Sequence, residues 1–184
     1  MDNCDFDNEY EPVVSAFSLV TNQLGPKVIT NIFLESGSDR NVIISPVAMT
    51  SQLTILHEGA GGDTKTELEK LTLLPEHGSL QAMAEIQNRY ECITKGKIQA
   101  KNAMFLDKSF QPKPDFVNRV QMTKSNIFKM NFAEQPELSR SIIDTWAATQ
   151  SGVKDIELPE DTITKETSML LLSSVHFEAK WAVK

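Results

Sequence analysis

The sequence predicts an α+β fold. Helical patterns come first, and strands and helices then follow in mixed order, without the regular strand–helix–strand alternation of a parallel α/β protein. No internal repeat, linker or low-complexity tract divides the chain. Its 184 residues are enough for one domain with a core, and 40% hydrophobic and 23% charged residues are typical of a soluble globular protein.

The first part of the chain combines an acidic segment with a helical pattern. Residues 1–11 hold five acidic and no basic side chains, so we expect a flexible arm there and a domain over residues 12–184. Apolar residues then recur at helical spacing on both sides of Gly25-Pro26. Because proline interrupts the hydrogen bonding of a helix interior, we predict a helix over residues 26–35 with a kinked turn before it.

A short apolar segment and a well-marked helix come next. Residues 41–44 predict a buried strand. Ser45 is placed to cap a helix whose first turn contains Pro46 and which ends at Gly59.

The remaining elements follow from caps and from the spacing of apolar residues. Thr64 and Glu67 form the pattern of a capping box and predict a short helix to about residue 71. Further patterns predict, in order, a helix from Ser79, a strand over 97–106, a helix over 114–122, a strand over 127–132, a helix over 139–150 and a strand over 167–177. Asn102 is the polar exception on one face of the strand over 97–106.

Charge and composition exclude several classes of function. The net charge of -7 argues against nucleic-acid binding, which needs clustered basic residues. No apolar run reaches the length of a membrane span, and the acidic N-terminus lacks the apolar region of a signal peptide. These features fit a cytoplasmic protein or a mature secreted chain, and the initiating Met1 favours the first. Cys4 and Cys92 are too few for a disulfide framework; a bridge between them stays open, and two free thiols are the simpler interpretation.

No motif makes a convincing catalytic, metal or cofactor site. Gly59 to Thr66 approaches a phosphate-binding loop, but the glycine before Lys65 is missing and a helix rather than a strand precedes it. A helix end followed by a helix start explains the same residues, so a nucleotide-dependent enzyme using Lys65 and Thr66 ranks last among the hypotheses. The three histidines are too scattered to be metal ligands.

Four segments together resemble the serpin family. The first is the run from Asn41 through Ser45-Pro46 to Gly59-Ala60-Gly61 and Thr64. It is followed by Asn102-Ala103-Met104-Phe105, by Ile143-Asp144-Thr145-Trp146 and by the strand pattern from Thr167 to Trp181. The resemblance covers about residues 20 to 184 and implies the N-terminal half of the serpin fold, with helices A to F and strands of sheet A, ending after the third strand of that sheet. Residues 12–184 would then be a partial serpin domain.

The resemblance also implies a function and structural roles. Serpins inhibit serine endopeptidases: the protease cleaves a reactive-centre loop, which then inserts as a strand into sheet A. By this resemblance the shutter, the region under the centre of sheet A, would contain Ser45, Pro46 and Ser173. Trp181 would lie at the breach, where the loop first inserts, and Ile143 and Trp146 would pack helix F. For Trp146, packing in the core is the simplest interpretation.

Two features of the sequence bear on inhibition. The reactive-centre loop would follow Lys184, so we expect a fragment or a non-inhibitory form, and the target protease stays open because the loop sets specificity. Ser173 and Ala179 stand where the family usually has asparagine and glycine, which also bears on opening of the sheet. The alternative is an interaction protein that associates, with itself or a partner, through the open edge of sheet A. Expected partners are a serine protease for a complete form and neither nucleic acid nor membrane; the resemblance implies an extracellular location.

Overall fold

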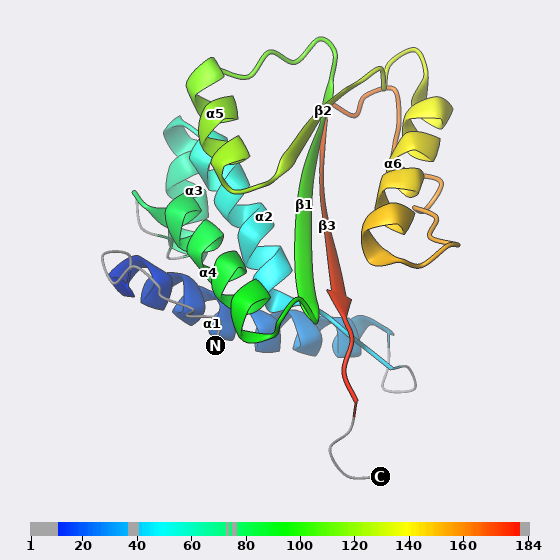
Figure 1. Cartoon of the computed structure of the whole chain (residues 1–184). Coiled ribbons are helices and arrows are strands. Elements are labelled where there is room, and N and C mark those ends of the chain that lie inside the picture. The colour runs from blue at the N-terminus through cyan, green and yellow to red at the C-terminus, as the bar shows by residue number, and fades with distance from the viewer. Residues whose placement is uncertain (1–10, 37–40, 73, 75–76, 181–184) are drawn as a thin grey trace. The chain divides into compact units, whose positions relative to one another are not determined.

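The computed structural model describes residues 11–36, 41–72, 74 and 77–180. The chain divides into two compact units, residues 1–89 and 90–184, each of which has its own packing. Helices come first along the chain, and strands and helices then follow in mixed order, as expected for an α+β fold (Figure 1). Among the described residues, no helix is both long and apolar enough to cross a bilayer.

The secondary structure of the described part of the N-terminal unit is helical. Their bounds are α1 Glu11–Ser36, α2 Pro46–Gly59, α3 Gly62–Thr72 and α4 Ser79–Ile93, the last of which crosses into the second unit. Helix α2 packs against both α1 and α3. The start of α1 is fixed to α4 by Arg89, whose guanidinium lies 3.0 Å from carboxylate oxygens of both Glu85 and Glu11.

The predicted kink before residue 26 is wrong. Helix α1 is continuous from Glu11 to Ser36 and contains Pro26 in its interior. Its packing against α2 outweighs the one backbone hydrogen bond that proline removes. Gly25, which is buried beside this proline, lets the ring of Pro46 approach α1 so closely that a Cβ at Gly25 would lie 2.8 Å from Pro46 Cγ.

Two further local predictions in this unit are wrong. Residues 41–45 form neither helix nor strand, and Ile43 is 95% exposed, so the expected buried strand is absent there. Helix α3 begins at Gly62, two residues before the predicted cap. Thr64 therefore lies inside the helix and cannot cap it. The adjacent hydroxyl of Thr66 donates to the carbonyl oxygen of Gly62 within the first turn.

A three-stranded mixed sheet forms the centre of the C-terminal unit. Its strands are β1 Ile98–Asp107, β2 Asn126–Met130 and β3 Met169–Phe177, in the order β2-β1-β3. Strand β1 is parallel to β2 and antiparallel to β3. The register pairs Ala103 with Leu172 and Phe105 with Leu170. Among the described residues, β3 has a strand partner on one side only.

Helix α6 covers one face of this sheet. Helices α5, Pro114–Met122, and α6, Pro136–Ser151, connect the strands, and α5 has the predicted bounds. Figure 1 shows α6 beside β3, in agreement with the contacts between the two. Alternate residues of a strand point to opposite faces. Ala103 and Phe105 therefore face α6, whereas Asn102, Met104 and Leu106 lie on the other face.

The state of Cys92 differs from the simpler expectation. There is no free cysteine among the described residues, and Cys92, on α4, is disulfide-bonded, so the expectation of a free thiol at this position is wrong. Cys4 lies outside the described residues.

Candidate functional site

The β1–β3 pair carries one polar contact in the middle of an apolar face. Asn102 on β1 and Ser173 on β3 are direct partners in the register. The hydroxyl of Ser173 donates to the side-chain oxygen of Asn102, which is only 2% exposed. Both residues lie on the face opposite α6, where the neighbouring Met104 and Leu106 are fully buried. A buried amide must be hydrogen-bonded to be tolerated, so this contact ties β3 to β1 in one register.

On the opposite face, α6 is held to the sheet by an apolar cluster. Its helical members are Ile143, which is 0% exposed, Trp146 and Ala147. The Trp146 ring meets Phe105 of β1 edge-on, with ring centres 5.8 Å apart and planes at 83°. Phe105 also stacks on Phe128 of β2, at a ring-centre distance of 5.0 Å. The two residues assigned to helix packing by resemblance thus lie together in this cluster.

Ser45 and Pro46 lie together at the start of α2, in the N-terminal unit. The Ser45 backbone is extended, and its hydroxyl oxygen accepts a hydrogen bond of 3.3 Å from the backbone N–H of Ala48, while Pro46 occupies the first turn. This is the N-cap geometry that the sequence predicts. Ser173, the third residue assigned to the shutter, belongs to the C-terminal unit. Trp181, the fourth of these predicted positions, lies outside the described residues.

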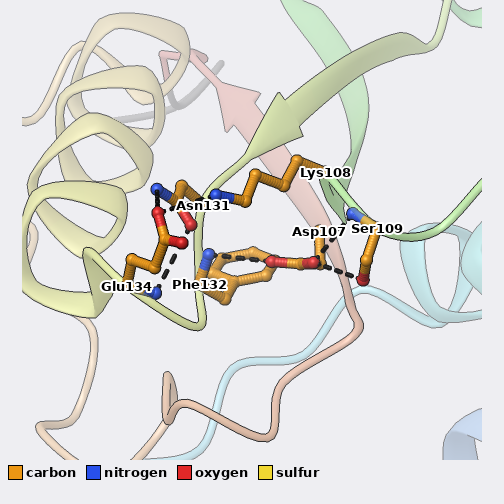
Figure 2. A network of polar contacts seen from close by, with 6 residues as sticks. All are labelled: Asp107, Lys108, Ser109, Asn131, Phe132 and Glu134. Carbon is orange, nitrogen blue, oxygen red and sulfur yellow. Dashed lines mark hydrogen bonds and ion pairs between the residues drawn. The ribbon is translucent and has the colours of Figure 1, made fainter.

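A polar network joins the end of β1 to the residues that follow β2 (Figure 2). The carboxylate of Asp107 accepts hydrogen bonds from the Ser109 hydroxyl at 2.6 Å, the Ser109 N–H at 2.9 Å and the Phe132 N–H at 3.0 Å. These donors, the Ser109 hydroxyl most of all, lower the pKa of Asp107 below its ordinary value. The negative charge is therefore retained on a side chain that is only 5% exposed.

An exposed ion pair extends the same network. Lys108 Nζ lies 2.7 Å from Glu134 Oε2, and the Asn131 side-chain N–H donates to that oxygen at 2.9 Å. The hydrogen bond from Lys108, and next that from Asn131, lower the pKa of Glu134. These residues are not among the site residues that the sequence predicts. The signal present is an aspartate two residues before a serine, which is the pattern of a side-chain-to-backbone turn.

An open groove lies along the outer side of α6, between that helix and residues 152–157, with a volume of about 740 Å³. Its walls carry charges of both signs, from Arg140, Asp144 and Lys154 among others. Arg140 and Asp144 form an ion pair at 3.9 Å, and Asp144 also accepts a hydrogen bond from the Leu158 N–H at 2.9 Å. Across the described part of the chain, no cluster of three or more His, Cys, Asp or Glu side chains could hold a metal ion.

Comparison with known proteins identifies the family of this fold. The family model described as "Serpin (serine protease inhibitor)" matches residues 20–184. An uncharacterized serpin-like protein of Methanosarcina acetivorans is 27% identical over 153 residues, which are 80% of this chain and 36% of that protein. The leukocyte elastase inhibitor of Bos taurus is 28% identical over 149 residues, covering 78% of this chain and 39% of the relative.

Solved structures agree with the sequence comparison. The crystal structure of native protease nexin-1 with heparin superposes with a TM-score of 0.77 and 26% identity. The superposition covers 91% of this chain and 47% of that structure. The chain therefore spans less than half the length of these relatives, and the fold described above corresponds to part of theirs.

Proposed function

This chain belongs to the serpin family, and from that premise we propose that it acts in the inhibition of a serine endopeptidase. Its contribution would be the sheet that accepts the inserted strand: a cleaved reactive-centre loop would pair with the edge of β3 opposite β1. The observation that carries the proposal is the position of β3, which is paired with β1 on one side and has no described strand on the other. The matches to proteins named as protease inhibitors support it.

The proposed roles of individual residues follow the same mechanism. Ser173 and Asn102 would form part of the shutter, since their hydrogen bond holds β3 against β1. Ser45 and Pro46, at the start of α2 in the N-terminal unit, are the other residues to which the resemblance gives a shutter role. Ile143 and Trp146 would hold α6 over the sheet, as their burial under that helix supports. Trp181 would lie at the breach. The protein would carry out no catalysis of its own.

Adduct formation tests this function. The endogenous protein is incubated with trypsin-like, chymotrypsin-like and elastase-like serine proteases and run on a denaturing gel. We expect an SDS-stable band that contains peptides of both proteins, because inhibition by loop insertion traps the protease covalently. Cleavage of the protein without a trapped species, with every class of protease, would contradict inhibition. The matched control is a protease whose active-site serine has been blocked beforehand.

The intact mass of the endogenous protein gives the adduct result its meaning. A species near 20.6 kDa would correspond to the 184 residues alone and would exclude loop insertion for that product. A species about twice as heavy is the size expected if the reactive-centre loop is present. Mass spectrometry of the immunoprecipitated protein distinguishes these two species. The same measurement on culture medium and on cytosol decides between a secreted and a cytoplasmic form.

The edge of β3 that has no strand partner among the described residues also favours a second function, association with another protein or with a second copy. An exposed edge strand presents unpaired backbone groups to a partner, and the central residues Leu170, Leu171 and Leu172 are apolar and half-buried. Light scattering at micromolar concentration tests self-association. A concentration-dependent rise in mass supports it, and a monodisperse monomer that captures no edge-binding peptide excludes it.

A further inference from the structure

The C-terminal end of α6 is attached to β3 by one histidine. His176 is half-buried on β3 and lies an even number of residues from Leu170 and Leu172, so it shares their face of the sheet, the face that α6 covers. Its Nδ1 lies 3.1 Å from the carbonyl oxygen of Ser151. A carbonyl oxygen can only accept, so the Nδ1–H of His176 is the donor.

Ser151 is the last residue of α6, where a helix leaves carbonyl groups without partners. Part of this need is met locally: the Gly152 N–H donates to Ala148 O at 3.0 Å. Helix α6 has no basic residue in its own last turn to satisfy the remaining carbonyls. His176, 25 residues further along the chain, supplies the donor from the strand instead.

The two attachments of α6 to the sheet differ in kind. The middle of the helix is held by the apolar cluster around Ile143 and Trp146. Near its C-terminal end, Ala148, Thr149 and Gly152 line the open groove, and Thr149 and Gly152 are exposed. The last turn therefore has water on its outer side, and the hydrogen bond from His176 joins it to β3.

We propose that His176 is a positioning residue that tethers the last turn of α6 to β3 and sets how readily this turn lifts from the sheet. The inference rests on the proposed function, because β3 is the strand beside which the inserted strand would be added. Because the tether joins β3 directly to α6, a change in β3 would be passed to that helix. Loosening the tether would let the last turn of α6 open more readily than the rest of the helix.

Two substitutions distinguish the contribution of the aromatic ring of His176 from that of its hydrogen-bond donor. His176→Phe keeps an aromatic ring and removes the Nδ1–H. His176→Asn removes the ring but places an amide N–H at the same distance from the backbone as Nδ1. Val175→Ala, on the opposite face of β3, is the matched control, and His176→Leu replaces the phenylalanine variant if that variant does not fold.

Hydrogen–deuterium exchange of peptides spanning residues 146–153 is the measurement, made on the full-length protein and its variants. We expect His176→Phe to speed exchange in the last turn of α6 about 5-fold, the loss that corresponds to one ordinary hydrogen bond. The amides of residues 138–145 should change by less than about 2-fold, and His176→Asn should restore slow exchange. Unchanged exchange in the phenylalanine variant, or an asparagine variant that exchanges as fast, overturns the tether.

This test fails or succeeds independently of protease inhibition. Exchange is measured without any protease, so a confirmed tether together with no protease adduct would refute the proposed function and leave the tether standing. An adduct formed by a protein whose last α6 turn is indifferent to His176→Phe would refute only the tether.

Discussion

Ser173 of β3 donates its hydroxyl hydrogen bond to the side-chain oxygen of Asn102, its direct partner on β1. The contact lies on an apolar face of the sheet, with Asn102 only 2% exposed. An apolar pair at these positions would need no hydrogen bond, whereas a buried amide and a buried hydroxyl are tolerated only when they are hydrogen-bonded. The pair therefore specifies the β1–β3 register, since a shift of one residue would separate the two groups and reverse the faces of β3.

Removing the hydroxyl tests this contact. We expect Ser173→Ala to lower the free energy of unfolding by about 1 kcal/mol, the typical net value of a hydrogen bond in a protein interior. Ser174→Ala, the next residue on the opposite face, is the control and should cost less. Urea unfolding followed by tryptophan fluorescence measures both. Equal costs would show that the Asn102 contact does not contribute to stability.

The burial of Ile143 predicts a large effect of shortening its side chain. Ile143 is 0% exposed in the cluster under α6, so Ile143→Ala removes buried apolar surface and leaves a cavity, at a cost of about 2–5 kcal/mol. The neighbouring Ile142 is 46% exposed, and Ile142→Ala should change stability by less than about 0.5 kcal/mol. Thermal or urea unfolding compares the two. Similar losses for both would mean that α6 is not packed on the sheet through Ile143.

The close approach of Gly25 and Pro46 predicts that Gly25→Ala destabilises the protein, whereas helix propensity alone predicts that it stabilises it. Alanine in a helix interior is favoured over glycine by about 1 kcal/mol. A Cβ at Gly25, however, would lie 2.8 Å from the Pro46 ring, which has no flexible end that can move away. Overpacking of this kind costs about 1–3 kcal/mol, so we expect a net loss of stability for Gly25→Ala.

Gly61→Ala is the control for this prediction. No atom lies within 4 Å of a Cβ at Gly61, so alanine there should be neutral or slightly stabilising. A Gly25→Ala variant that is as stable as Gly61→Ala would contradict the tight packing of α1 on α2.

Asp107 predicts how stability depends on pH. Its pKa is lowered in the folded state from the ordinary value of 3.8, mainly by the Ser109 hydroxyl, so the folded state binds this proton more weakly than the unfolded state does. The contribution to stability is therefore complete above the unfolded pKa and is lost as the pH falls through the folded pKa.

The corresponding measurement is urea unfolding between about pH 6 and pH 2. Asp107→Asn should flatten the acid loss of stability, whereas Asp161→Asn, at an exposed aspartate, should keep the slope of the unmodified protein. Identical slopes for all three proteins would show that Asp107 does not carry the dependence.

Local signals in the sequence determine some elements and mislead for others. Proline at the first turn and regular apolar spacing predict α5 with its observed bounds, and the Ser45 cap predicts the start of α2. Pro26 misleads because the packing of α1 on α2 outweighs a missing hydrogen bond. Residues 41–44 have the composition of a strand, but a strand also needs a neighbour with free backbone groups, which a local pattern does not reveal.

Contacts between distant residues explain what else was missed. Asn102 stands out in the sequence as a polar exception, but its partner Ser173 follows 71 residues later and becomes visible only through the register. His176 gives no local sign of its contact with the end of α6, and the Phe132 N–H reaches Asp107 across 25 residues. The roles proposed for Ser45, Pro46, Ser173 and Trp181 come from the resemblance, because no local pattern in the sequence indicates them.

The most direct test of the account is hydrogen–deuterium exchange of β3 in the endogenous protein before and after reaction with a serine protease that it inhibits. Amides of residues 169–177 that point away from β1 should be more strongly protected in the trapped complex than before the reaction, because a new strand pairs with the edge of β3 opposite β1. Protection that is unchanged along β3 while the protease is covalently trapped would contradict the central claim that this edge accepts the inserted strand.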